Sequence, residues 1–403
     1  MALNVAIARD DFPILEKKFN NKPLIYFDSA CMSLKPKQVL DAMNEYYTDY
    51  TSCVGRSAHR LGRIATDKYS EAREKIAKFI GAKPEEIIFT RNTTEGINLI
   101  AHSLDFKSGD IVLTTDKEHN SNLLPWQLLK DKGISHKICK SSSDGCFDFE
   151  NFEKELCRSV KLVSMVHTSN VDGVTIPAKD IIKRAHENKS LVLLDAAQYA
   201  PHKRIDVKKL DVDFMAFSGH KMLGPTGVGI LYGKYALLEK LKPFMVGGNT
   251  VKNTTYETHE FLKPPAKFEA GLQNYAGAIG FGAAVDYLQK IGLDSIEVHE
   301  TELNRMISKE ISEIPKLKIL GPQNPELRSG IISFVIEGMD NHVIAQLLDK
   351  MENIAVRSGE HCAHSWFNAH KLQGSVRASL YLYNTKEEAK IFIETLKKIA
   401  GLR

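Results

Sequence analysis

The stretch DFMAFSGHKMLGPTGVGILYG (Asp213–Gly233) sets one lysine, Lys221, between two short apolar runs. The runs DFMAFS (Asp213–Ser218) and GVGILYG (Gly227–Gly233) have the length and apolar content of buried strands. The segment between them is rich in glycine, which is typical of a loop. The stretch therefore predicts two buried strands, with a lysine just after the first.

Four more apolar runs precede this stretch and alternate with helical patterns. They are EIIFT (Glu86–Thr90), IVLTT (Ile111–Thr115), KLVSMVHT (Lys161–Thr168) and LVLLD (Leu191–Asp195). RNTTEGINLIAHSL follows the first run and AKDIIKRAHEN follows the third, and both have the pattern of a helix. Apolar strands that are separated by amphipathic helices predict an α/β fold with a mainly parallel sheet covered on both faces.

The pattern changes after about residue 294. A predicted helix (Ser295–Ile314) leads into the apolar runs KLKIL and GIISFVIEG, then into the helical HVIAQLLDKM. The segment SVRASLYLYN and an amphipathic helix, KEEAKIFIETLKKIAG, complete the chain. We expect a large domain over residues 20–294 and a smaller α+β domain over residues 1–19 and 295–403.

Composition excludes several classes of protein. The 403 residues are 43% hydrophobic, which is enough for a large core, and the formal net charge is only +4. No dense run of Lys and Arg is present, so we expect no nucleic-acid partner. The first residues lack the pattern of a signal peptide, and no apolar run is long enough to span a bilayer. The expectation is a soluble, cytoplasmic protein without a membrane partner.

Six cysteines are scattered without a CxxC pair or zinc-like spacing, at positions 31, 53, 139, 146, 157 and 362. In a cytoplasmic protein most should be reduced packing residues, Cys31 and Cys53 included. The segment RSGEHCAHSW (Arg357–Trp366) is different, because it sets Cys362 among polar residues. From these residues alone Cys362 is a metal ligand, a reactive thiol or a small buried residue.

Two polar side chains stand at strand ends, where open α/β sheets bind ligands. Asp195 ends LVLLD and serves either as a helix cap or as a carboxylate that holds a protonated ring nitrogen, with Gln198 close behind. Lys221 follows DFMAFS. It is either a surface lysine or an amine of lowered pKa that forms a Schiff base with a carbonyl.

Two further segments add groups that bind an anion and a ring. Thr93 and Thr94 lie where a predicted helix begins, so they cap the helix, bind an anion beside its free N–H groups, or do both. His119, in KEHNSN, is placed to stack on a flat ring or to transfer protons. A phosphate site, an acid for a ring nitrogen and an amine for an aldehyde together predict pyridoxal 5'-phosphate (PLP) as the cofactor.

The chain resembles the class V aminotransferase family of fold-type I PLP enzymes, and within it the cysteine desulfurases and selenocysteine lyases. The resemblance runs from YFDSA at Tyr26 to YLYNT near Thr385, and its most specific part is DAAQ followed by SGHKMLGPTGVGILYG. It implies a fold-type I PLP-dependent transferase fold, with a large sheet domain and a smaller α+β C-terminal domain.

The resemblance also implies a role for each matching residue. The implied PLP-binding residues are Lys221, Asp195, Gln198, His119, Thr93, Thr94, Ser218 and His220. The implied substrate-binding residues are Arg377, which grips the substrate carboxylate, Asn170 and Arg357. RSGEHCAHSW aligns with the cysteine loop of the family, which makes Cys362 the catalytic thiol that takes sulfur as a persulfide, beside the catalytic Lys221 and His119.

The implied reaction converts L-cysteine to L-alanine. It supplies sulfur to an acceptor protein, a scaffold or carrier for iron–sulfur cluster assembly, from a homodimer. No metal site is expected, because His361 and His364 are too few ligands. The alternatives are a selenocysteine lyase, a cysteine sulfinate desulfinase, or an epimerase or aminotransferase of the same family. A non-catalytic binder that kept the fold is the alternative from another class.

Two positions depart from the family pattern. Glu360 in GEHCA stands where the family usually has histidine, and a nearby carboxylate disfavours a thiolate. Leu272 in FEAGLQN stands where the family usually has a threonine that reaches the cofactor phosphate across the dimer. That contact is therefore lost or replaced, with Gln273 as the candidate replacement.

Overall fold

The fold is built on a seven-stranded sheet in a computed structural model that describes residues 3–401. The strands are β4 (Ile87–Thr90), β5 (Ile111–Thr115), β6 (Ser135–Cys139), β7 (Val160–Val166), β8 (Leu191–Asp195), β9 (Phe214–Ser218) and β10 (Gly229–Gly233). Their order is β4-β10-β9-β8-β7-β5-β6, and β10 is antiparallel to both of its neighbours while the ladders from β9 to β6 are parallel. The predicted mainly parallel sheet is confirmed.

Strand β6 is the one strand of this sheet that the apolar pattern did not predict. Its sequence, SHKIC, mixes polar and apolar residues, and most of it is exposed or half-buried. It lies at the edge of the sheet, where one neighbour and partial burial suffice, so it lacks the continuous apolar run of a central strand.

Both faces of the sheet are buried because strand side chains alternate between them. In β8, Val192 and Leu194 join one apolar cluster, whereas Leu193 joins the cluster on the other face. All three are fully buried, and each such side chain contributes about 1.5–3 kcal/mol to folding. Burial on both faces is what makes the strand sequences continuously apolar.

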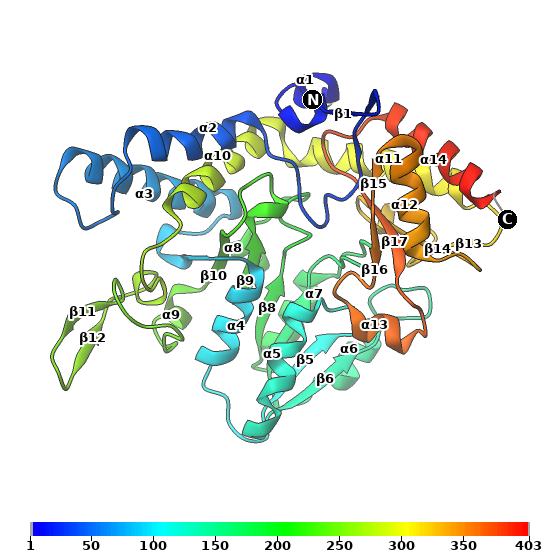
Figure 1. Cartoon of the computed structure of the whole chain (residues 1–403). Helices are drawn as coiled ribbons and strands as arrows, with labels where there is room; N and C mark the ends of the chain where they lie inside the picture. The colour runs from blue at the N-terminus through cyan, green and yellow to red at the C-terminus, as the bar shows by residue number, and fades with distance from the viewer. Residues whose placement is uncertain (1–2, 402–403) are drawn as a thin grey trace.

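Helices cover the two faces, as Figure 1 shows. The helices before residue 292 are α1 (Val5–Arg9), α2 (Lys37–Asp49), α3 (Arg60–Ile80), α4 (Thr93–Ser103), α5 (Leu124–Gln127), α6 (Phe149–Glu155), α7 (Ala178–Glu187), α8 (Val207–Leu210), α9 (Tyr235–Leu238) and α10 (Tyr275–Ile291). The nearly all-apolar α10 packs against α2 and α3. Helix α4 packs on the opposite face against β9 and β10, which places its N-terminus at the end of β9.

A second sheet of four antiparallel strands lies in the C-terminal part of the chain, in the order β13-β14-β17-β16. The strands of this sheet and the helices around it are α11 (Leu293–Ile311), β13 (Leu317–Ile319), β14 (Ile331–Ile336), α12 (Asn341–Glu352), β16 (Arg357–Gly359), α13 (His364–Ala369), β17 (Ser375–Ser379) and α14 (Lys386–Ala400). Apolar residues of α11, α12 and α14 pack with this sheet into a separate cluster. The expected change to an α+β arrangement after residue 294 agrees with this second sheet.

Residues near the N-terminus contact both parts of the chain. Strand β3 (Ile25–Tyr26) pairs in parallel with β15 (Ile354–Ala355), and the backbones of Asp28 and Ser379 form an isolated parallel β-bridge. Phe12 instead belongs to the larger apolar cluster. The division of the chain into residues 20–294 and the remainder stays a prediction.

Two small hairpins complete the described fold. They are β1 (Lys18–Phe19) with β2 (Lys22–Pro23), and β11 (Val251–Thr254) with β12 (His259–Phe261), which projects from the body of the molecule in Figure 1. Within residues 3–401, every helix is too short or too polar to cross a lipid bilayer.

Candidate active site

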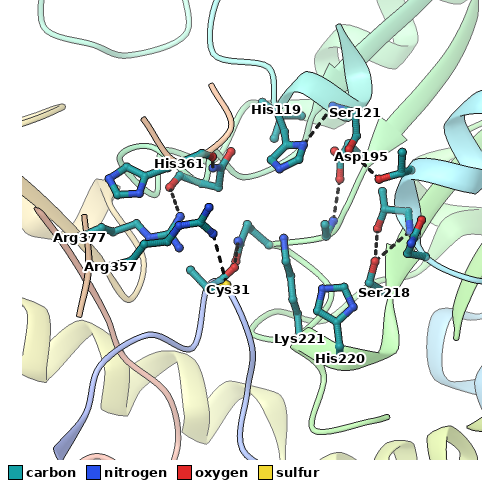
Figure 2. Close-up of a pocket in the computed structure, with 18 residues that line it drawn as sticks. Cys31, His119, Ser121, Asp195, Ser218, His220, Lys221, Arg357, His361 and Arg377 are labelled. Atoms are coloured by element: carbon teal, nitrogen blue, oxygen red, sulfur yellow. Dashed lines mark hydrogen bonds between the residues drawn. The ribbon is translucent and has the colours of Figure 1, made fainter. Parts of the chain in front are cut away.

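A cavity of about 220 Å³ lies at the carboxyl ends of the parallel strands and beside the four-stranded sheet. Its lining residues are Ala30, Cys31, Asn92, Thr93, Thr94, His119, Ser121, Val166, Asn170, Asp195, Ala197, Gln198, Ser218, His220, Lys221, Arg357, His361 and Arg377. Every residue that the sequence assigned to a site lines this cavity, except Cys362. Figure 2 shows the labelled side chains around it.

Lys221 and Asp195 form the charged centre of the cavity. Asp195 ends β8, and Lys221 ends the short helix η5 (Gly219–Lys221) that follows β9. Burial lowers the pKa of Lys221, an effect that the negative charge of Asp195 partly offsets. Burial raises the pKa of Asp195. The backbone N–H of Ala197 donates to Oδ1 at 3.0 Å, and this hydrogen bond partly offsets the rise. Two opposite charges are thus held in a site that penalises both, and such sites are typical of catalysis.

The N-terminus of α4 forms one wall. The Asn92 side chain caps the helix by accepting from the backbone N–H of Glu95 at 3.0 Å. The backbone N–H of Thr93 donates to Ser218 Oγ at 2.9 Å, and the Thr94 and Ser121 hydroxyls are 2.7 Å apart. Hydroxyl groups beside the free N–H groups of a helix N-terminus suit a phosphate. Asn92, and neither Thr93 nor Thr94, is the cap of this helix. The phosphate site at Thr93 and Thr94 stays a prediction.

His119 lies just after β5 and caps the short helix η3 (Asn120–Asn122) by accepting from the backbone N–H of Ser121 at 3.1 Å. Burial, reinforced by the positive charge of Lys221, lowers the pKa of His119 to about 3. The ring is therefore neutral near pH 7. A neutral imidazole that faces the cavity suits stacking on a flat ring better than it suits pairing with an anion.

Two arginines enter the cavity from the four-stranded sheet. Arg357 of β16 and Arg377 of β17 are register partners in adjacent antiparallel strands. Arg377 is 1% exposed, and its Nη1 donates to the backbone carbonyl of Asn170 at 3.0 Å. Its Nη2 lies 3.6 Å from Asp28 Oδ1, and neither Nε nor Nη2 has a hydrogen-bond partner among the described residues. This edge of the guanidinium thus has two donors without a hydrogen bond among the described residues, and two such donors match the two oxygens of a carboxylate.

Other buried polar atoms of the cavity also lack partners. Asn170 Oδ1 and Gln198 Oε1 accept no hydrogen bond within residues 3–401, although each amide nitrogen donates to a backbone carbonyl at 2.7 Å. An unpaired buried polar atom costs about 1–3 kcal/mol, so such atoms normally have a partner. The orphaned acceptors, the free arginine edge and the hydroxyl-lined wall fit a polar ligand that carries a phosphate, a ring and a carboxylate.

The cysteine loop lies next to the cavity. Arg357 Nη2 donates to Cys362 Sγ at 3.6 Å, and the Cys362 carbonyl accepts from the backbone N–H of Asn120 at 2.7 Å. His361 and Cys362 both have positive φ, of 50° and 58°. Two consecutive non-glycine residues in this region store local strain, which is a feature of functional loops. Cys362 itself is half-buried.

The sequence reasoning missed Cys31 by treating it as a packing residue. Cys31 lines the cavity, and Arg357 Nη1 donates to its Sγ at 3.3 Å. For His361 the sequence suggests only the rejected role of a metal ligand, whereas in the structure the residue is buried and its Nε2 lies 2.8 Å from Ser375 Oγ. The position of Cys31 in DSACMS, a segment that could border the site, was the only signal in the sequence.

Glu360 and Leu272 are the two departures from the family pattern, and the structure shows what each of them contacts. Glu360 Oε2 lies 3.1 Å from His364 Nε2. Leu272 is 68% exposed, and the Gln273 side chain donates to the backbone carbonyl of Ala270 at 2.9 Å. Among the described residues, no group of three or more His, Cys, Asp or Glu side chains is placed to hold a metal ion.

Comparison with known proteins places the chain among others of similar sequence and fold. The family described as "Aminotransferase class-V" matches residues 25–392. A probable cysteine desulfurase of Halalkalibacterium halodurans is 44% identical over 96% of this chain and 96% of its own length, and one of Synechocystis is 43% identical over 97% and 94%.

Solved structures agree with the sequence comparison. The apo cysteine desulfurase of Thermococcus onnurineus is 38% identical, with a TM-score of 0.94 over 100% of this chain and 99% of that chain. The cysteine desulfurase CsdA of Escherichia coli is 30% identical, with a TM-score of 0.92 over the whole of both chains. The predicted fold and the family resemblance are confirmed.

Proposed function

The chain belongs to the class V aminotransferase family, and from this membership we propose that it is a PLP-dependent cysteine desulfurase. It converts L-cysteine to L-alanine and carries the removed sulfur as a persulfide on Cys362. One observation carries this proposal. A single cavity brings together a half-buried lysine, a buried carboxylate and an arginine that has two unused hydrogen-bond donors among the described residues, and the cysteine loop contacts its wall.

PLP fits the residues of the cavity. Thr93, Thr94, Ser218 and His220 would hold its phosphate, Asp195 its ring nitrogen, Gln198 its ring hydroxyl and His119 the face of its ring. When bound, PLP supplies an electron sink for the carbon from which a proton is removed. The unpartnered Gln198 Oε1 and the buried Asp195 carboxylate are the observations of this chain that support the fit.

The substrate carboxylate binds to Arg377. The free Nε and Nη2 atoms supply two donors on one edge of the guanidinium, which matches the two oxygens of a carboxylate. Asn170, whose backbone carbonyl accepts from Arg377 Nη1, sets the direction of the guanidinium and offers its own side chain to the substrate.

Lys221 moves the substrate proton. Its Nζ takes the proton from the α-carbon and later returns a proton to the product. The lowered pKa of Lys221, caused mainly by burial, makes the neutral amine available for this role at neutral pH. Burial lowers the pKa of His119 to about 3, so the ring is neutral at pH 7 and would hold the face of the cofactor ring rather than give up a proton.

Cys362 accepts the sulfur. Its thiolate attacks the substrate sulfur, a new S–S bond forms, and the bond between that sulfur and the β-carbon breaks with its electron pair left on carbon. Proton return then gives alanine. Cys362 lies beside the cavity but does not line it, so the loop must move to bring the thiol to the substrate.

The test measures alanine release from L-cysteine by the holoenzyme and by Cys362→Ala, with a reductant present. We expect the variant to bind PLP and to make neither alanine nor sulfide. The matched control is Cys157→Ala, because Cys157 is exposed and far in sequence from the cysteine loop. Full activity of Cys362→Ala with L-cysteine would refute the role of Cys362. It would favour a selenocysteine lyase or another reaction of this family.

A homodimer fits the exposed apolar surface. Met245 and Leu272, which are 39% and 68% exposed, line a surface cavity of about 340 Å³, and Val246 next to Met245 is 61% exposed. A second copy that covered them would remove apolar area from water. Light scattering of the holoenzyme tests the dimer, and a monomeric mass at micromolar concentration would contradict it.

Three further features complete the proposal. The sulfur passes to an acceptor protein, a scaffold or carrier for iron–sulfur cluster assembly. All six cysteines are free, which fits a reducing compartment such as the cytoplasm. The large domain (20–294) holds PLP, and the smaller one carries the cysteine loop and Arg377.

A further inference from the structure

A second thiol faces the cavity from a segment far from the cysteine loop. Cys31 lies in the turn after Asp28, whose carbonyl accepts from the Cys31 backbone N–H at 3.1 Å. Its side chain lines the same cavity as Lys221 and is half-buried. The mechanism above gives this thiol no role.

One guanidinium contacts both sulfur atoms. Arg357 Nη1 donates to Cys31 Sγ at 3.3 Å, and Nη2 of the same side chain donates to Cys362 Sγ at 3.6 Å. Figure 2 shows Arg357 extending over Cys31. The two thiols are therefore held on adjacent nitrogens of one planar group, although they are 331 residues apart in the chain (362 − 31). Packing alone does not require two thiols around one half-buried charge.

We propose that Cys31 is a second sulfur-carrying residue, which exchanges the persulfide sulfur with Cys362 across Arg357. This inference rests on the proposed function, because the sulfur first arrives on Cys362. The Cys31 thiolate attacks the outer sulfur of the Cys362 persulfide. A new S–S bond forms on Cys31, the S–S bond on Cys362 breaks, and its electron pair leaves on the Cys362 thiolate. The persulfide is neither oxidised nor reduced overall, so no oxidant or reductant is needed.

The geometry favours such an exchange. The exchange breaks one S–S bond and forms another of the same kind, so the equilibrium between persulfide on Cys362 and persulfide on Cys31 is close to even. The rate of exchange depends on access to the two sulfurs and on their charge. Arg357 offers a positive charge and N–H donors to whichever sulfur bears the negative charge. Its planar fork reaches both at once, which a lysine ammonium on one flexible stem would do less well. Arg357 thus acts as a positioning residue for the pair.

A consequence for the cycle follows. Transfer to Cys31 returns Cys362 to the thiol form while the sulfur stays in the cavity, away from bulk solvent. Cys362 is then free to accept a second sulfur. The holoenzyme should therefore hold up to two sulfane sulfurs per chain before any acceptor protein is added.

The experiment treats the holoenzyme with L-cysteine under anaerobic conditions without reductant. Thiols and persulfides are then capped with an alkylating reagent, and each cysteine peptide is measured by mass spectrometry, with alanine measured in the same sample. We expect one added sulfur on both Cys31 and Cys362. Cys362→Ser should lower the persulfide on Cys31 by about tenfold or more, because its donor is gone. In Cys31→Ser the added sulfur should appear on Cys362 alone.

Arg357→Lys separates positioning from simple proximity. Because Arg357 also lines the substrate cavity and contacts Cys362, this variant should form persulfide more slowly overall. The readout is therefore the ratio of Cys31 persulfide to Cys362 persulfide at early times, and this ratio should fall. The exposed Cys157 peptide of each sample reports sulfur that spreads through solution, and it should carry none.

The outcomes are distinct. Persulfide on Cys362 but none on Cys31 in the wild type would overturn the exchange and leave the proposed function intact. Persulfide on Cys31 that persists in Cys362→Ser would also overturn it, and would make Cys31 the first acceptor. Equal amounts of persulfide on Cys157 and Cys31 would show that sulfur reaches both residues through solvent, and this would also overturn the exchange. Absence of alanine and of persulfide on both thiols would refute the proposed function itself.

Discussion

Replacement of Arg377 by lysine should separate substrate binding from chemistry. Arg377 is 1% exposed and already donates from Nη1 to the Asn170 carbonyl, so its Nε and Nη2 edge remains for the substrate. Lysine keeps the positive charge but offers a single ammonium in place of this edge. Arg377→Lys therefore removes one of two parallel charge-assisted hydrogen bonds.

The expected loss follows from that one bond. A hydrogen bond to a charged group contributes about 1.5–3 kcal/mol, which corresponds to about 10- to 150-fold in kcat/KM. The carboxylate is bound in both the ground state and the transition state, so most of the loss should appear as a higher KM with a smaller change in kcat. The assay is the initial rate of alanine release over a range of L-cysteine concentrations, with reductant present.

The matched control is Arg305→Lys, because Arg305 lies on the surface with 53% of its side chain exposed and pairs with Glu326. It should change kcat/KM less than about twofold, as is usual for surface substitutions. The absorbance of bound PLP confirms that both variants are loaded. A kcat/KM for Arg377→Lys within about threefold of the wild type would refute the assignment of Arg377 to the substrate carboxylate.

Three other substitutions test the site and the fold. Lys221→Ala should lower alanine formation by roughly 10²- to 10⁴-fold as the proton-transferring amine is lost, and a rate close to wild type would rule Lys221 out. Burial lowers the pKa of His167 to about 3, so its contribution to stability is present above pH 6.5 and is lost as the pH falls toward 3. Between pH 6.5 and pH 5, the wild type should therefore lose about 1.6 kcal/mol more unfolding free energy than His167→Gln in urea titrations, and equal losses would contradict this. Glu269→Gln should destabilise the fold by about 3–5 kcal/mol, because it breaks a buried pair in which Arg73 donates twice at 2.8 Å, and an unchanged thermal midpoint would count against that estimate.

The predicted strands and the polar residues at their ends are the part of the site that local sequence could specify. Asp195 and Lys221 each follow a continuous apolar run, and parallel strands bring their carboxyl ends to one edge of a sheet. Thr93 follows a strand of the same sheet and begins α4. These residues meet because their strands pair in register, so their spacing along the chain was informative.

Contacts between segments that are distant in the chain could not be predicted from these local sequence patterns. The register that sets Arg357 opposite Arg377 depends on the pairing of β16 with β17. Strand β16 has only three residues, all half-buried, so it gives little apolar signal. Strand β6 was missed for a related reason, since an edge strand needs no continuous apolar run.

By itself, therefore, the sequence determined the α/β fold, the strand-end lysine and aspartate, and the family whose cofactor they fit. Burial on both faces of a parallel sheet imposes a local pattern that any reader of the chain can recognise. Only the tertiary structure decided that Cys31 and Cys362 meet on the two nitrogens of Arg357. That meeting depends on how the segment after β3 and the cysteine loop are placed against the second sheet. No short stretch of sequence encodes a contact whose geometry is set by the packing of separate elements.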